Sequence, residues 1–162
     1  MTSRYLPLAL FLVLVVMAAA FGASFPAGDW YVELRKPYWT PPAWVFGPAW
    51  SVLYVLMALA MWRVWITGHY VRVGALIWWL IQLGLNAAWS WLFFGLNRIG
   101  WAMAEMALLV VFVILCIKAF SSISRLATWM MVPYLLWLLF AFALNVTIWD
   151  MNGGGAGLFY FD

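Results

Sequence analysis

The sequence predicts an all-α integral membrane protein, a bundle of five transmembrane helices with an ordered aromatic loop between helices 1 and 2. Hydrophobic residues make up 69% of the 162 residues and charged residues only 8%, which leaves too little polar surface to cover a soluble globule. The chain contains five apolar runs, each close to the length of about 20 residues that a helix needs to cross the hydrocarbon. Between the first two runs lies a segment too polar and too rich in proline to span a membrane. These features together define the predicted fold class.

The predicted spans leave little of the chain for a soluble domain. We expect one transmembrane domain at residues 1–150, followed by a glycine-rich tail at 151–162 that is flexible by composition. The five spans are expected at about residues 6–25, 47–66, 73–94, 99–120 and 128–149, with the loop at 26–46.

The first span has a second interpretation. Arg4 followed by an apolar stretch and the alanines at 18–20 also resembles a secretory signal. A run of about 20 apolar residues is long for the core of such a signal. We therefore expect the first helix to be retained.

The loop after the first span is dense in tryptophan and proline, and we expect it to be an ordered lid over a ligand site. Pro37, Pro41 and Pro42 each lack a backbone donor and hold the preceding residue extended, so the loop cannot be one continuous helix. The alternative is an interfacial aromatic belt, which membrane proteins commonly have. A belt explains scattered tryptophans better than this proline-stiffened segment. The tryptophans are Trp30, Trp39, Trp44 and Trp50.

The second span has an aromatic and methionine stripe. Pro48 lies at its predicted start, where a missing N–H is tolerated. Lipid would accept the stripe, but the hydroxyl of Tyr54 needs a partner, so we expect the stripe to face the bundle. The stripe consists of Trp50, Tyr54, Met57 and Met61.

The third span has its polar side chains on one face. An amide in hydrocarbon must find a hydrogen-bond partner, so Gln82 and Asn86 should face the interior of the bundle. A hydrogen bond between helices explains these amides about as well as contact with a ligand. Trp89 and Phe93 share the same face.

The opposite face of the third span has small residues. Gly84 and Ala88 have the four-residue spacing that allows two helices to approach closely. A homodimer through this face is one interpretation, although the same spacing is common by chance.

The fourth span contains an ionisable group and the single cysteine. Glu105 lies inside this span, where an ionisable side chain is a functional candidate by default. We favour a structural role for it, as an ion pair with Arg98 or a hydrogen bond. Cys116 has no second cysteine to pair with and is most simply a packing residue.

The fifth span should be kinked in its early part by Pro133, unless the helix starts at that residue. Beyond the proline, several residues share one face of the helix. Ala141 is the small residue of this face, and it leaves a gap beside Trp137 that a larger side chain would fill. The face consists of Tyr134, Trp137, Ala141, Leu144 and Ile148, with Asn145 at its edge.

The basic residues in the short loops predict the orientation, because lysine and arginine are enriched on the cytoplasmic side. The N-terminus, second loop and fourth loop share one side, which favours a cytoplasmic N-terminus and places the lid outside. The rule would mislead in an outer membrane. The formal net charge of +3 does not indicate nucleic acid. The basic residues on the side of the N-terminus are Arg4, Arg63, Arg72, Lys118 and Arg125, and those on the lid side are Arg35, Lys36 and Arg98.

A set of residues at fixed spacing runs through the loop and the later spans. In the loop it comprises Trp30, Tyr31, Leu34, Lys36, Pro37, Trp39, Pro41, Pro42, Trp44, Gly47, Pro48 and Trp50. It continues with Gln82, Asn86, Trp89, Phe93, Phe94, Gly95, Gly100, Trp101, Ala102, Pro133, Tyr134, Leu135, Trp137, Ala141, Leu144 and Asn145. In this pattern the chain resembles the translocator protein family, known in bacteria as tryptophan-rich sensory proteins and in mitochondria as the peripheral benzodiazepine receptor. The resemblance covers nearly the whole chain except the end of the tail.

The resemblance implies ligands and a role in transport, sensing or stress regulation. The implied ligands are protoporphyrin IX and related tetrapyrroles, isoquinoline carboxamide drugs and benzodiazepine-type drugs. Arg35 and Lys36 of the lid could contact the propionates of a porphyrin. An aromatic cavity suits such flat, apolar molecules. We expect it to be lined by Trp39, Phe46, Trp50, Tyr54, Asn86, Trp89, Phe93, Trp137, Ala141 and Leu144.

Two other functional classes stay open. The resemblance also implies an enzyme that promotes light- and oxygen-dependent degradation of protoporphyrin IX, with Trp50 and Trp137 as the catalytic candidates. A scaffold that acts through partner proteins is the third class. The sequence has no hydrolytic triad, phosphate loop or metal cluster, so we expect neither a cofactor nor a metal.

The chain departs from the family at one motif. Animal members have a cholesterol motif in the fifth helix, and two of its positions are occupied here by Val146 and Asp150. These substitutions put sterol recognition in doubt, and such motifs are weak indicators in any case.

Overall fold

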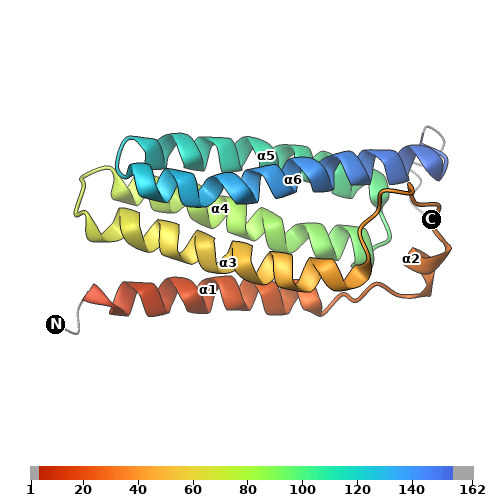
Figure 1. Cartoon of the computed structure of the whole chain (residues 1–162), viewed down its shortest axis with the longest axis horizontal. Helices are drawn as coiled ribbons and strands as arrows, with labels where there is room; N and C mark the ends of the chain where they lie inside the picture. Colours follow the sequence, from red (N-terminus) through yellow and green to blue (C-terminus); the bar gives the residue numbers. More distant parts are fainter. Residues whose placement is uncertain (1–3, 155–162) are drawn as a thin grey trace.

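The computed structural model describes residues 4–154, which form five long helices side by side along the axis of an elongated bundle (Figure 1). All five are long and apolar enough to cross a membrane, and residues 4–154 contain no strand. The predicted fold class is therefore confirmed. The helices are α1 (Leu6–Ala23), α3 (Ala43–Ile66), α4 (Arg72–Ser90), α5 (Ile99–Ser121) and α6 (Arg125–Met151), with a short helix α2 (Asp29–Glu33) in the loop.

The connections alternate between the two ends of the bundle. The start of α1 lies at the same end as the loops at 67–71 and 122–124 (Figure 1). The long loop at 24–42, the turn at 96–98 and the end of α6 lie at the other end. The lid is thus separated from the start of α1 by the length of the spans, while a cytoplasmic N-terminus stays a prediction.

Two helix boundaries differ from the sequence-based estimates. Helix α3 begins at Ala43 because Pro42 has an extended backbone and acts as its N-cap, so Pro48 lies inside the helix instead of at its start. Helix α6 begins at Arg125, where the hydroxyl of Ser124 accepts a hydrogen bond from the N–H of Ala127, and Pro133 is therefore also internal. At its other end α6 reaches Met151, and the predicted tail lies outside the described residues from position 155 onward.

Helix α4 ends in a π-helical turn, η2 (Trp91–Gly95), in which the N–H of Leu96 donates to the carbonyl of Trp91 at 2.8 Å. The turn brings Gly95 against the start of the lid, where an added Cβ would lie only 2.9 Å from Phe25. A larger residue at position 95 would therefore force the Phe25 side chain to move. Such turns are frequent at functional sites.

Trp79 of α4 is fully buried and belongs to the main hydrophobic core of the bundle. Its indole N–H donates to the carbonyl of Met57 on α3 at 3.1 Å, and its ring packs edge-to-face against Phe11 on α1. Met57 and Met61 are fully buried, so the stripe of the second span faces the bundle as predicted. This packing fills the half of the bundle away from the lid, and the space that remains lies beneath the lid.

Candidate functional site

A cavity of about 640 Å³ lies beneath the lid, among the lid-proximal halves of the helices. This volume is in the range of small-molecule sites, which span roughly 300–1,000 Å³. The lid contributes Tyr31, Lys36, Thr40 and Pro41 to the wall, and all five long helices contribute as well. On the α1 side the wall is made of small residues, Ala19, Gly22 and Ala23, which leave the interior wide.

The structure brings nine of the predicted site residues into the wall of this one cavity. They come from three helices and from η2, and they surround the space with aromatic rings. These residues are Phe46, Trp50, Tyr54, Asn86, Trp89, Phe93, Trp137, Ala141 and Leu144. Their contact with a ligand stays a prediction.

Trp39 is the predicted site residue that does not line the cavity. Its side chain is 37% exposed and packs edge-to-face against Phe140 of α6, with ring centroids 5.8 Å apart. The reason is a tight turn in the lid, in which the N–H and the hydroxyl of Thr40 both donate to the carbonyl of Pro37. This turn directs Trp39 over the outside of α6.

The rings of the wall are held by one another. Trp89 stacks on Phe93 with centroids 4.9 Å apart and an angle of 22° between planes. Trp137 packs edge-to-face against Phe46, with ring centroids 5.9 Å apart. Trp50 packs beside Tyr54 at 5.5 Å. Because each ring is fixed by a neighbour, the cavity presents preformed flat surfaces.

Asn86 joins three helices at the inner end of the cavity. Its side-chain oxygen accepts a hydrogen bond from the hydroxyl of Tyr54 on α3 at 2.6 Å. Its side-chain nitrogen donates to the hydroxyl of Tyr134 on α6 at 3.0 Å. Of the two roles left open for this amide, the structure shows the interhelical one, and Asn86 also borders the cavity.

Asn145 and Trp89 also line the cavity, and neither has its polar group paired. The side-chain oxygen and nitrogen of Asn145 and the indole N–H of Trp89 are buried without a hydrogen-bond partner among the described residues. Asn145 was not among the predicted site residues. The rule applied to Gln82 and Asn86, that an amide in a span faces the interior, would have identified it.

Glu105 makes no hydrogen bond with the described residues. Such a bond was one of the two structural roles that we expected for it, the other being an ion pair with Arg98. Both of its carboxyl oxygens are buried and have no hydrogen-bond partner in the described part of the chain. The neighbouring α5 residues that face the core, Ala102, Met106 and Leu109, are apolar and offer no donor. Glu105 is also not one of the residues that line the cavity.

Lys36 holds the lid together from within. Its ammonium group donates to the carbonyls of Tyr31, Val32 and Leu34 and lies 4.5 Å from the centre of the Tyr31 ring. A lysine has three N–H donors, so these bonds use all of them. In this arrangement all its donors are engaged while its positive charge remains at the cavity wall, so the expected contact with a ligand propionate stays a prediction.

Two features secure the lid beyond Lys36. Tyr31 packs edge-to-face against Phe93 and Phe94 of η2, with ring centroids 6.1 and 5.4 Å apart, and this burial raises the pKa of its phenol. Asn152, at the end of α6, pairs with the backbone of Arg35, accepting from its N–H at 3.0 Å and donating to its carbonyl at 2.8 Å. The same nitrogen also donates to the carbonyl of Ile148. Asn152 thus fastens the lid to the bundle.

The sequence is similar to known proteins along most of its length. It matches the model of the TspO/MBR family over residues 9–150. It is 39% identical to protein CrtK of Rhodobacter capsulatus over 150 residues, which are 90% of this chain and 92% of that protein. It is 38% identical to the tryptophan-rich sensory protein of Cereibacter sphaeroides over 135 residues, 83% of this chain and 84% of that protein. It is 37% identical to the human translocator protein over 142 residues, 84% of each.

The contact between Asn152 and Arg35 predicts how strongly the Arg35 N–H is protected from hydrogen exchange. In Asn152→Ala the Arg35 N–H loses its acceptor, and we expect its hydrogen exchange to accelerate by about tenfold, equivalent to about 1.4 kcal/mol. Hydrogen exchange resolved at Arg35 in detergent-solubilised protein measures this. Thr147→Ala on the same helix is the control, because the Thr147 hydroxyl bonds only to its own helix. Unchanged exchange at Arg35 in Asn152→Ala would show that the lid is held by other contacts.

Proposed function

Because this chain belongs to the TspO/MBR family, we propose that it binds tetrapyrroles such as protoporphyrin IX, and other flat lipophilic molecules, in the cavity beneath the lid. The protein is an integral, multi-pass membrane protein. The observation that carries the proposal is the cavity of about 640 Å³, whose wall combines several fixed aromatic rings with few polar groups. We propose a role in transport, sensing or stress regulation on the basis of the relatives, two of which are named as a sensory protein and a translocator.

The wall favours ligands that bind by stacking and shape. Aromatic rings from two different helices, Trp89 of α4 and Trp137 of α6, line the cavity and are available to a planar ring system. Among the described residues of the wall, Lys36 is the only cation and none is acidic. The Lys36 ammonium is therefore the one ionic partner that the described wall offers a ligand, and the aromatic surfaces also suit isoquinoline carboxamide and benzodiazepine-type drugs.

The surface of α4 supports a further, separate part of the proposal, a homodimer. Gly84 is exposed, and a Cβ added there would meet no atom within 4 Å. The bundle therefore leaves room for a second helix against this face. Membrane lipid is the other occupant that this surface suits.

A second candidate function is the degradation of protoporphyrin IX in light and oxygen. It is favoured by the positions of Trp50 and Trp137, the two catalytic candidates, which both line the cavity. Illumination of the protein with bound protoporphyrin IX should then produce a new absorbing species, and Trp50→Phe should abolish it. Absorption spectra recorded with and without light distinguish the two functions, since a protein that only binds gives a spectral shift without a product.

Ala141 provides the test of the proposed binding site. Ala141→Thr adds a branched group to the wall, and we expect the affinity for protoporphyrin IX to fall by about tenfold, equivalent to about 1.4 kcal/mol. Quenching of tryptophan fluorescence measures the affinity. Ala143→Thr is the matched control, because Ala143 is exposed on the same helix and does not line the cavity. Equal affinities for both variants and the wild type would place the binding site elsewhere.

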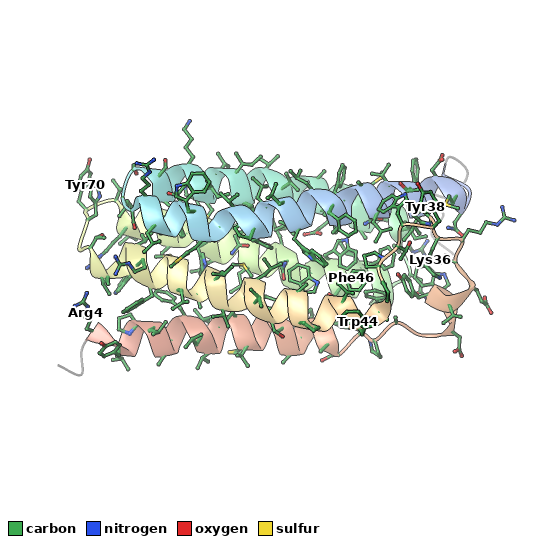
Figure 2. All side chains as sticks on the ribbon, in the orientation of Figure 1. Arg4, Lys36, Tyr38, Trp44, Phe46 and Tyr70 are labelled. Carbon is green, nitrogen blue, oxygen red and sulfur yellow. The ribbon has the colours of Figure 1, made fainter. Side chains whose placement is uncertain are left out.

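The structure also predicts that metal-free porphyrin binds at least as well as haem. Haem iron usually takes an axial ligand such as His, Cys, Met or Tyr. His69 lies next to Tyr70, at the end of the bundle opposite Lys36 and Phe46 (Figure 2), and the hydroxyl of Tyr54 already donates to Asn86. No group of three metal-binding side chains occurs among the residues searched, those that the structure describes.

The haem prediction is tested by titrating haem and protoporphyrin IX into the wild type and His69→Ala. We expect similar affinities for the two ligands and no change in the variant. A strong preference for haem that disappears in His69→Ala would contradict both the binding mode and the position of the site.

A further inference from the structure

A groove of about 710 Å³ lies on the outside of the bundle, between α3 and α6. The residues that line it belong to the first half of α3 and the middle of α6, inside two of the spans, so the groove faces the lipid. Trp44, Val52 and Leu136 of its wall are exposed. The described wall contains no charged and no amide side chain. The groove is therefore an apolar hollow distinct from the cavity beneath the lid.

A layer of aromatic side chains separates this groove from the cavity. Phe46 lines the cavity, Phe140 lines the groove, and Trp137 alone among the described residues lines both. The ring of Trp137 packs against the other two rings, with centroids 5.9 Å from Phe46 and 5.6 Å from Phe140. The two spaces are therefore divided at this point by side chains, which change rotamer far faster than packed helices move.

Helix α3 is weakened beside this layer. Gly47 lines the cavity and Pro48 lines the groove. Pro48 has no N–H to donate to the carbonyl of Trp44, and glycine adds backbone freedom, so the helix bends most easily here. Trp44 and Phe46 belong to the turn that precedes this point, at the lid end of α3 (Figure 2). A bend at Gly47 and Pro48 therefore moves Phe46 relative to Trp137.

We propose that the groove is a second binding site, which takes flat lipophilic molecules from the membrane and passes them beside Trp137 into the cavity. This inference rests on the proposed function, that the cavity binds such molecules, and it adds an outer site and a route of entry. The route does not require the lid to open. It leaves intact the hydrogen bonds that Lys36 and Asn152 make to the lid backbone.

The wall of the groove favours a rigid, flat molecule over an acyl chain. The rings of Trp137 and Phe140 are tilted by 41° to each other, and both line the groove. A planar ring system gains stacking contacts with such rings. It also has few torsions to fix on binding, whereas an acyl chain loses the freedom of many. Apolar molecules concentrate in the hydrocarbon, which the groove faces.

Two substitutions fill the groove and leave the cavity wall unchanged. Ala49 and Val52 line the groove and are not among the residues that line the cavity. Ala49→Phe and Val52→Phe each add a ring to the groove, and Val52 is 60% exposed, so its replacement adds nothing to the core. Ala143→Phe is the matched control, because Ala143 is exposed on α6 and lines neither space.

The outer site is tested by the number of ligands bound. The full chain in detergent is titrated with protoporphyrin IX, and native mass spectrometry counts the molecules bound to each chain. We expect a second bound molecule in the wild type and in Ala143→Phe, and its loss in Ala49→Phe and in Val52→Phe. Absence of the second molecule from the wild type would show that the groove holds only lipid or detergent.

The route is tested by the rate of binding. Stopped-flow quenching of tryptophan fluorescence by protoporphyrin IX is measured with the protein in phosphatidylcholine nanodiscs. We expect Ala49→Phe and Val52→Phe to slow binding and release by about tenfold, with Ala143→Phe at the rates of the wild type. The affinity of the cavity should stay within about threefold of the wild type, because an obstacle on the route slows both directions equally.

Pro48→Ala tests whether α3 bends on this route. Alanine restores an N–H for the carbonyl of Trp44 and stiffens the helix. We expect this variant to bind and release protoporphyrin IX about threefold more slowly, although its smaller side chain widens the groove. Faster binding in Pro48→Ala would show that the width of the groove, and not the bending of α3, limits entry.

The outcomes separate this inference from the proposed function. If both groove variants bind and release protoporphyrin IX at the rates of the wild type, the route is wrong while the cavity still binds its ligand. Faster binding in Asn152→Ala, which loosens the lid, would then show that the ligand enters past the lid. If the wild type binds no protoporphyrin IX, this inference and the proposed function both fail.

Discussion

Asn86 connects α3, α4 and α6 by using both ends of its amide, and the arrangement of the cavity follows from this connection. Inside hydrocarbon no water completes the bonds of a polar group, so a buried amide must find its partners within the protein. A rotation of any of the three helices by one residue, about 100°, would carry its group away from the shared point. The aromatic rings of the wall lie three or four residues along each helix from this point: Trp50 from Tyr54, Trp89 from Asn86, and Trp137 from Tyr134. Since residues at this spacing share a helix face, fixing the polar contact also directs the three rings into one space.

The lid and the bundle are stabilised by different interactions. The bundle closes by packing of apolar side chains around Trp79 and Met57. The lid lies at the end of the helices, and it is held by hydrogen bonds that Lys36 and Asn152 make to its backbone. The lid also packs aromatic rings on the bundle, Trp30 and Tyr31 against Phe93 and Trp39 against Phe140. Its hydrogen bonds to Asn152 are exposed, and exposed hydrogen bonds are typical of segments that open locally. A ligand site beneath such a segment can exchange its contents while the helices keep their packing.

The chemistry of the cavity limits what it can recognise. Its wall has several aromatic faces, no carboxylate among the described residues, and one lysine whose donors are used within the lid. Shape and stacking therefore supply most of the affinity, and selectivity depends on the few polar groups that are unpaired. The membership in the TspO/MBR family and this wall favour the same class of ligand, a flat and mainly apolar molecule.

The sequence by itself determined the fold class, the number of spans and most of the wall. Span number follows from local composition, because a run of about 20 apolar residues has no other stable place than a membrane. The wall follows from helical periodicity, which places Trp50, Asn86 and Trp137 on interior faces whatever their neighbours are. Only the tertiary structure decided which polar groups are paired and where the lid side chains point. Asn86 and Asn145 are both amides in spans, yet one meets two tyrosines and the other meets none, because a hydrogen bond depends on what a different helix presents opposite it. In the same way, the turn at Thr40 directs Trp39 to the outside of α6, and three backbone carbonyls of the lid occupy the donors of Lys36. Helical periodicity does not relate the groups that make these contacts.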